Sequence, residues 1–239
     1  MNYSPIQIGN DTLRYALVQE GKHTLFVLGL NPSTADAEKP DKTMKAVIKF
    51  AEYNGYDGFV MLNLYPLRAT NPNDLPLEAD LQLHRKNLEE ISKLIEGIND
   101  IDVWLAFGAN AKKRHYLLES FQEIVSILEL HNAHFICFGK LTKNGCPPHP
   151  LYRKSEVFRK FLLESLLAPK EVRNFAAEHH LGSIIKFSNK KRGYDVYIIG
   201  SMQDFGPLPP PTGLPIAIAY KKGEPIIFPK GYDVFEWFN

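Results

Sequence analysis

Short apolar runs alternate with amphipathic segments along the chain from Thr24 onward. Four of the runs have the length and the β-branched or aromatic content of buried strands, and they cover residues 24–30, 58–64, 102–108 and 134–138. Apolar side chains three and four residues apart predict helices between and after these strands. The helices are expected from the cap Asp41 to near Gly55, through Leu77 to Ile95, as one long or broken helix from about Asn110 to Leu130, and over 155–166.

This repeated strand–helix order predicts a parallel sheet covered by helices on both faces. We therefore expect an α/β fold in residues 1–168, with three α/β/α layers and a four-stranded parallel sheet. After Pro169 the pattern predicts a helix over 170–182, strands over 183–189 and 194–201, and a hairpin over 214–229. Residues 169–239 are thus expected to form a small α+β appendage, in which the Pro-rich stretch 205–213 is a stiff connector or a polyproline ligand.

Charge and composition argue against proteins that coat nucleic acid, membrane proteins and secreted disulfide-bonded proteins. The chain has 239 residues and a formal net charge of +1. A protein that coats nucleic acid is usually more basic, so we expect nucleic-acid contacts only at local patches, around Lys112, around Lys140 and over 189–193. The apolar runs are too short for a membrane span, and the first residues lack the pattern of a secretory signal. The two cysteines make no disulfide framework, so a cytoplasmic protein without membrane contact is expected. No pattern indicates an oligomeric state.

Polar residues follow each of the four predicted strands. In a parallel α/β sheet the ligand crevice lies beyond the carboxyl ends of the strands, so these segments are the first candidates for a site. In chain order they read NPSTAD, NLYPLRAT, GANAKKR and GKLTKNGCPPHPLY. Each can bind or react, and each also has a simpler structural interpretation.

The first segment combines a close backbone approach with several polar groups. Gly29 allows a ligand near the backbone, and Pro32 fixes the turn. Amide, hydroxyl and carboxylate groups come from Asn31, Ser33, Thr34 and Asp36. The alternative is an ordinary strand-to-helix turn in which Ser and Thr act as caps.

The second and third segments offer base and phosphate contacts. Asn63 lies inside an apolar strand, and its amide can read the edge of a pyrimidine or bond a neighbouring loop. Arg68 can grip a phosphate through two hydrogen bonds or form a surface ion pair. Asn110 is expected to cap the following helix, with Lys112 and Lys113 in its first turn. A bound anion there would offset their unfavourable interaction with the helix dipole, and the alternative is a tolerated surface pair.

The fourth segment holds His149 between two prolines. A histidine fixed in this way can donate a hydrogen bond to a carbonyl that becomes negative in the transition state. It can also bind a metal, but no second histidine or carboxylate stands at ligand spacing. A zinc ion is therefore not expected. No other metal and no organic cofactor is expected either. Cys146 lacks the motif of a base-activated nucleophile.

Together the four segments resemble the DUF1643 family. The resemblance covers about residues 11–166. The motifs that carry it are the NPSTAD box at 31–36, a D-x-T at Asp41 and Thr43, the NL-(Y/F)-x-x-RAT segment at 63–70 with Tyr65, and HPLY at 149–152, which ends in Tyr152.

In the same order, and more distantly, the segments resemble the uracil-DNA glycosylase superfamily. There a G-x-D/N-P turn holds the hydrolytic water, an LLLN strand supplies a base-reading Asn, and a final HPSPLS loop carries the catalytic His. The matching positions are 29–32, Asn63 and His149. The resemblance implies a three-layer fold around a four-stranded parallel sheet. The chain departs from it by Asn31 in place of the Asp of the most active members and by the absence of the loop serines that grip duplex DNA.

This resemblance leads to a hypothesis of N-glycosidic hydrolysis of a nucleobase in DNA or in a nucleotide. Asn31 would position the water, since an amide cannot take a proton, and Asp36 or Asp41 would act as the base. Asn63 would read the nucleobase, and His149 would stabilise it as it leaves. Phosphate would be contacted by the cations Arg68, Lys112 and Lys113. The alternative hypothesis is a non-catalytic protein that binds a nucleotide or nucleic acid in the same crevice.

Overall fold

The computed structural model describes residues 1–138, 142 and 146–152, followed by strands at 158–160, 183–189, 194–200, 216–221 and 224–228. From Tyr152 onward only the backbone is described. The chain divides into two compact units, Met1–Phe161 and Leu162–Asn239, and each is presented by itself.

The N-terminal unit is built on a seven-stranded sheet in the order β1-β2-β4-β3-β5-β6-β7. Its four central strands are parallel to one another and correspond to the four strands predicted from the sequence: β4 (Gly58–Asn63), β3 (Thr24–Gly29), β5 (Asp102–Leu105) and β6 (His134–Phe138). Antiparallel strands extend both edges. They are β2 (Arg14–Gln19) and β1 (Ile6–Gly9) beside β4, and β7 (Phe158–Lys160) beside β6.

The expectation of a sheet with only four strands is therefore wrong. Strand β1 has only exposed and partly exposed residues, and β2 mixes buried with partly exposed ones. Both strands therefore lack the continuous apolar run on which the prediction depended. Strand β7 falls within 155–166, where the apolar spacing predicted a helix. Pairing with the open edge of β6 overrides that local preference. The other residues of that predicted helix lie outside the described part of the chain.

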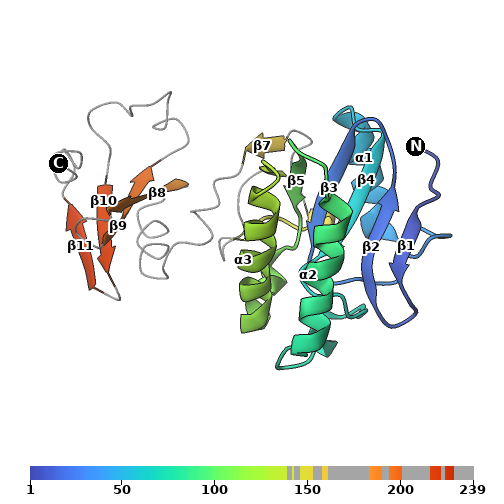
Figure 1. The fold of residues 1–239 in the computed structure, drawn as a ribbon, viewed down its shortest axis with the longest axis horizontal. Helices are drawn as coiled ribbons and strands as arrows, with labels where there is room; N and C mark the ends of the chain where they lie inside the picture. Colours follow the sequence, from blue (N-terminus) through green and yellow to red (C-terminus); the bar gives the residue numbers. More distant parts are fainter. Residues whose placement is uncertain are drawn as a thin grey trace. The chain divides into compact units, whose positions relative to one another are not determined.

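Helices cover both faces of this sheet, which confirms the predicted α/β class. The helix α1 (Lys42–Tyr53) packs on the face that carries Leu25 and Val27 of β3. The intervening Phe26 and Leu28 are also buried and point to the opposite face, because side chains alternate along a strand. Helices α2 (Leu81–Ile95) and α3 (His115–Glu129) lie side by side against the sheet (Figure 1).

The ends of α1 agree with the sequence signals. Asp41 caps the helix, and its Oδ1 accepts a hydrogen bond of 2.8 Å from the backbone nitrogen of Met44. Gly55, with φ +85°, follows the helix as predicted. Helix α2 begins later than expected, because Asp80 caps it at Gln82 and Leu83. The short η1 (Pro72–Asp74) lies in the loop before α2.

The expected helix at 110–130 consists of two pieces. A 3₁₀ turn, η2 (Ala109–Lys113), is followed by α3, which begins only at His115. Asn110 is therefore not the cap of a long helix, and Lys112 and Lys113 are not in its first turn. Gly108 precedes η2 with φ +72°, a backbone conformation that suits glycine and turns the chain sharply away from β5.

The strand order places a crevice between β3 and β5. The chain leaves β3 toward β4 on one side, and it leaves β5 toward β6 on the other side. These two connections therefore run in opposite directions from the position between β3 and β5. In open α/β sheets ligands bind at such a switch point, beyond the carboxyl ends of the strands. The polar segments after β3 and β5 flank this position.

The C-terminal unit contains an antiparallel sheet in the order β11-β10-β9-β8. Its strands confirm those predicted from the sequence: β8 (Ser183–Asn189), β9 (Tyr194–Gly200), β10 (Ile216–Lys221) and β11 (Glu224–Phe228). The predicted helix at 170–182 and the Pro-rich stretch 205–213 lie outside the described residues. Within the described part of the chain, no helix has the length and apolar character needed to cross a membrane.

Candidate functional site

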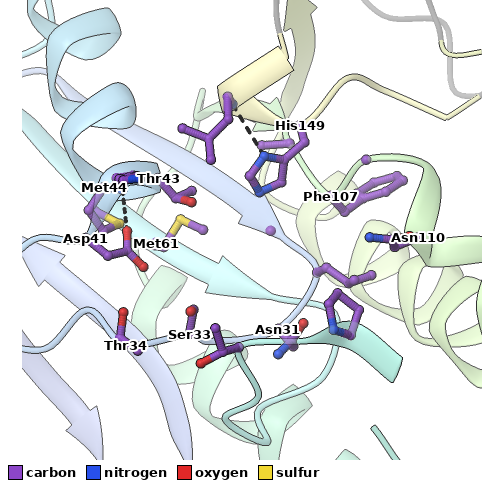
Figure 2. Close-up of a pocket in the computed structure, with 18 of the residues that line it drawn as sticks. Asn31, Ser33, Thr34, Asp41, Thr43, Met44, Met61, Phe107, Asn110 and His149 are labelled. Carbon is purple, nitrogen blue, oxygen red and sulfur yellow. Dashed lines mark hydrogen bonds between the residues drawn. The ribbon is translucent and has the colours of Figure 1, made fainter. Parts of the chain in front are cut away.

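A cavity of about 1190 Å³ opens at the carboxyl ends of β3 and β5. Its walls come from the turn after β3, the start of α1, the turn after β5 and the loop before η3 (Pro150–Tyr152) (Figure 2). The volume is somewhat larger than that of typical small-molecule sites. The cavity is lined by seven of the predicted site residues: Gly29, Asn31, Ser33, Thr34, Asp41, Asn110 and His149.

Asn31 is held in one orientation at the wall of the cavity. Its Nδ2 donates hydrogen bonds to the backbone oxygens of Pro32 (3.0 Å) and Ala69 (2.8 Å). Both amide hydrogens are therefore used, and the identity of the two amide ends is fixed. No described residue donates a hydrogen bond to Oδ1, so this oxygen is available to accept one from a ligand or a water molecule.

Two of the polar segments form a single wall. Backbone hydrogen bonds of 2.9–3.1 Å join residues 64–69 to residues 29–32. Arg68 adds hydrogen bonds from Nη1 to the backbone oxygens of Ser33 (2.9 Å) and Ala35 (3.0 Å) and from Nη2 to Oε1 of Gln7 (2.7 Å). Arg68 is absent from the cavity lining, and it holds the backbone of the NPSTAD turn in place.

The two candidate bases, Asp36 and Asp41, occupy different places. Asp36 is exposed and absent from the cavity lining, and its Oδ1 accepts hydrogen bonds from the backbone nitrogens of Lys39 (2.7 Å) and Glu38 (2.9 Å). These two hydrogen bonds lower the pKa of the Asp36 carboxyl. Asp41 caps α1 and also lines the cavity (Figure 2). The geometry therefore favours Asp41 over Asp36 as a group that acts on a ligand.

His149 lines the cavity from the loop before η3 (Figure 2). The backbone nitrogen of Leu151 donates to its Nδ1 (3.3 Å), so the proton of the neutral ring is on Nε2. Burial lowers the pKa of His149, and the negative charge of Asp41 opposes this shift in part. The ring is consequently neutral near pH 7. A Cβ on Gly108 would lie 3.0 Å from Cβ of His149, so the turn after β5 supports the histidine directly.

Asn63 lies beside the cavity rather than in its wall. Its side chain is completely buried, and both amide atoms lack a hydrogen-bond partner among the described residues. A Cβ on Gly29 would lie 2.6 Å from Cε of Met61 and 3.1 Å from Oδ1 of Asn63. Gly29 and Met61 line the cavity, whereas Asn63 does not. The unsatisfied amide therefore lies close to the cavity, next to the methyl end of Met61.

Arg14 also lines the cavity, although no sequence motif includes it. The register between β1 and β2 shifts at Gly9, which leaves Tyr15 as an extra residue in β2. Such a bulge re-aims the neighbouring side chains. Tyr15 interacts with charged groups of α2, whereas Nη1 of Arg14 donates to the backbone oxygen of Ala35 in the NPSTAD turn.

Arg14 and Arg68 form a pair of like charges at this turn, since both donate to the oxygen of Ala35. Arg14 is only 2% exposed, and its Nε has no hydrogen-bond partner among the described residues. Neither arginine forms a salt bridge within that part of the chain. Burial, and secondly the charge of Arg68, lower the pKa of Arg14 to about 10, while Asp41 acts in the opposite direction. A buried positive charge thus borders the cavity without a bonded carboxylate.

The remaining predicted site residues whose side chains the structure describes are absent from the cavity lining. Pro32 is buried in its turn. Tyr65 is buried too, and its hydroxyl accepts a hydrogen bond of 3.0 Å at the start of α2. Lys113 donates to a loop amide oxygen (2.8 Å), and Lys112 belongs to the same outward 3₁₀ turn. The side chain of Tyr152 lies outside the described residues.

Several cavity residues were missed by the sequence analysis. The most polar of them are Arg14, Lys42 and Lys45, and the most apolar are Met61 and Phe107. A partial signal existed for Lys42, which lies inside the D-x-T motif. None existed for Arg14, because its position depends on a bulge in a strand that the apolar pattern does not predict.

The sequence profile of a family described as "Protein of unknown function (DUF1643)" matches residues 14–151. The match spans more than half of the chain. The chain belongs to the DUF1643 family. No curated protein and no solved structure matches it.

The DUF1643 match contains the whole described wall of the cavity, from Arg14 to Leu151. The cavity is therefore a feature of the family region and not of the C-terminal unit. Within the described residues, this DUF1643 protein has no group of three or more His, Cys, Asp or Glu side chains that could hold a metal ion.

Proposed function

We propose that this DUF1643 protein is an N-glycosidic hydrolase that releases a nucleobase from a nucleotide or from DNA. The observation that carries the proposal is the presence of Asn31, Asp41 and His149 in the wall of one cavity. They supply a fixed acceptor for a water molecule, a carboxylate and a hydrogen-bond donor. Hydrolysis of a glycosidic bond to a base needs a group of each kind.

Water would be activated between Asn31 and Asp41. Oδ1 of Asn31 accepts a hydrogen bond from the water and orients it, but an amide cannot take the proton. Asp41 has one carboxylate oxygen bonded to the start of α1, and the second oxygen is left to receive the proton. The water oxygen bonds to the anomeric carbon while the C–N bond breaks, and the electron pair of that bond leaves with the base.

His149 would stabilise the departing base. The base gains negative charge as the C–N bond breaks, and a positioned hydrogen-bond donor lowers the energy of that state. The lowered pKa keeps the ring neutral near pH 7, and the hydrogen bond to Nδ1 keeps the proton on Nε2. His149 therefore acts as a hydrogen-bond donor in this scheme.

Asn63 would read the edge of the base after a movement of Met61. The amide of Asn63 has an unsatisfied donor and an unsatisfied acceptor, which is costly for a buried group. The end of Met61 lies next to it at the cavity. Methionine is unbranched and adapts its conformation easily, so a flat base can displace the methyl group and meet the amide.

The test is a measurement of free base released from nucleoside 5′-monophosphates and from single-stranded and duplex oligonucleotides that carry modified bases. We expect release by the unmodified protein and a loss of at least about 100-fold in Asp41→Asn and in His149→Ala, the range of a lost acid–base or electrostatic group. Lys49→Gln is the matched control, since Lys49 is an exposed residue of α1 that does not line the cavity. Absence of release from every substrate contradicts the proposal.

Asn31 in place of an acid favours one alternative, a non-catalytic protein that binds a nucleotide in the same cavity. Nucleotides would then raise the melting temperature of the protein without any release of base. In that case Asn63→Ala weakens binding, while Asp41→Asn does not. Release of base with any substrate excludes this alternative.

A further inference from the structure

The cavity has a basic end that the proposed hydrolytic groups do not use. It is lined by the cations Arg14, Lys42 and Lys45, and Asp41 is the single acidic residue among the described lining residues. Two lining lysines stand in the first turn of α1, which contains no acidic side chain. Three cations against one carboxylate leave an excess of about two positive charges on this wall.

Two features of this end are unfavourable without a ligand. Lysines in the first turn of a helix oppose its dipole. A buried guanidinium normally has a carboxylate or another anion as its partner, yet Arg14 has no salt bridge among the described residues and stands beside Arg68. Its Nε is also an unpartnered buried donor at a residue of the cavity wall. A bound anion would relieve both features at once.

We propose that the phosphate group of the substrate binds at this basic end, against Arg14 and the start of α1. The inference rests on the proposed function and adds to it that the substrate carries a phosphate near the sugar that is attacked. A phosphate monoester has about −1.5 to −2 charges near pH 7, which matches the excess charge of the wall. The planar guanidinium of arginine suits phosphate because it offers several donors in a fixed geometry.

The layout of the cavity agrees with a nucleotide in one orientation. Figure 2 shows Asp41 and Thr43 on the side of α1, and Phe107, Asn110 and His149 on the other side. A phosphate at α1 therefore places the sugar next to Asp41 and the base toward His149. The phosphate site is thus formed by Arg14, Lys42 and Lys45, whereas the sequence predicted Arg68, Lys112 and Lys113, which are absent from the lining.

The test compares the affinities of nucleoside 5′-monophosphates and of the corresponding nucleosides for the full chain, by calorimetric titration at low salt. We expect the phosphate to strengthen binding at least tenfold. Arg14→Gln should reduce this preference to about threefold or less, Arg14→Lys should retain part of it, and the pair Lys42→Gln and Lys45→Gln should weaken it several-fold. Lys49→Gln, an exposed change on the same helix, should leave it unchanged. Inorganic phosphate and a short single-stranded oligonucleotide are further probes, and a loss of their binding in Arg14→Gln supports the same site.

Equal affinity for nucleotide and nucleoside overturns the proposal, as does a preference that persists both in Arg14→Gln and in the double lysine variant. The lysines are exposed, so the double variant decides the question if Arg14→Gln does not fold. Base release measured separately keeps the two proposals apart. Release without a phosphate preference overturns the phosphate site alone, and an Arg14-dependent preference without release overturns the hydrolase alone.

Discussion

The turns after β3 and after β5 occupy equivalent positions at the two sides of the switch point. They differ in how many of their polar side chains line the cavity. The turn after β3 is held by the amide of Asn31, by backbone bonds to residues 64–69 and by Arg68. It presents Asn31, Ser33 and Thr34 to the cavity. The turn after β5 presents Asn110 and the backbone near Gly108, while Lys113 bonds to a distant loop.

The difference arises from the backbone that follows each strand. After β3 the chain runs into an α-helix capped by Asp41, so the first-turn residues Lys42 and Lys45 border the cavity. After β5 the positive φ of Gly108 leads into a 3₁₀ turn, and α3 begins only after Arg114. Lys42 and Lys45 therefore line the cavity from a helix start, whereas Lys112 and Lys113 lie in a short 3₁₀ turn and are absent from the lining.

The largest expected effect separates the two carboxylates near the β3 turn. Asp41→Asn should reduce base release by about 10²- to 10⁴-fold, the range for a lost general base. Asp36→Asn should change it by less than about threefold, because Asp36 is exposed and closes a turn outside the cavity lining. Steady-state rates with a saturating substrate measure both variants. A comparable loss of base release in the two variants would contradict a general-base role for Asp41. It would mean that both carboxylates affect the rate by keeping the turn in its shape.

The next effect compares the two asparagines that line the cavity from either turn. Asn31→Ala should lower base release by about 10- to 100-fold, since it removes an acceptor fixed by two hydrogen bonds. Asn110→Ala should lower base release by less than about fivefold, because in the proposed mechanism Asn31 and Asp41 hold the water and Asn110 does not. Melting temperatures of both variants serve as the control for folding. A larger loss in Asn110→Ala would assign the water to the β5 side.

The sequence was sufficient for the parts that depend on local patterns. Continuous apolar runs located the four parallel strands, and the cap Asp41 and Gly55 located the ends of α1. The order of these strands then placed the polar segments at one sheet edge, which is why Asn31, Asp41 and His149 share a cavity wall.

Other parts depend on pairing and register, which local patterns do not determine. Arg14 reaches the cavity through a bulge in β2, which pairs with β1 and β4. Arg68 donates hydrogen bonds to backbone oxygens of a turn that is distant in sequence. Asn63 belongs to a predicted strand, but whether its amide reaches the cavity depends on the neighbouring side chain of Met61, which lines the cavity. The lysines after β5 were misplaced because the chain forms a 3₁₀ turn where a helix start was expected.

A third prediction concerns the support that the β5 turn gives to His149. Gly108→Ala and Gly55→Ala both place an alanine at positive φ. Gly55→Ala should destabilise the protein by about 1–2 kcal/mol, and Gly108→Ala should cost about 1–3 kcal/mol, because φ +72° with ψ −178° is a conformation that is essentially restricted to glycine. Only at Gly108 does the added Cβ meet a neighbour, Cβ of His149 at 3.0 Å, whereas nothing lies within 4 Å of it at Gly55. Gly108→Ala should therefore also lower base release several-fold, and Gly55→Ala should not. Urea unfolding and rate measurements on both variants test this, and equal rates would show that the turn does not position the histidine.

The smallest expected effect is the pH dependence that His149 gives to stability. Its pKa in the folded protein lies below the ordinary 6.5 because of burial, so the unfolded chain takes up the proton first as the pH falls. The free energy of unfolding should thus retain the whole contribution of the neutral ring above about pH 6.5, and lose it as the pH falls from there toward the folded pKa. Urea unfolding at pH 7 and pH 5 should show a larger decrease for the unmodified protein than for His149→Gln, in which no group titrates at this position. The same decrease in both proteins would mean that other groups cause the acid sensitivity, and that the β5 turn and the loop before η3 do not hold the ring in its neutral state.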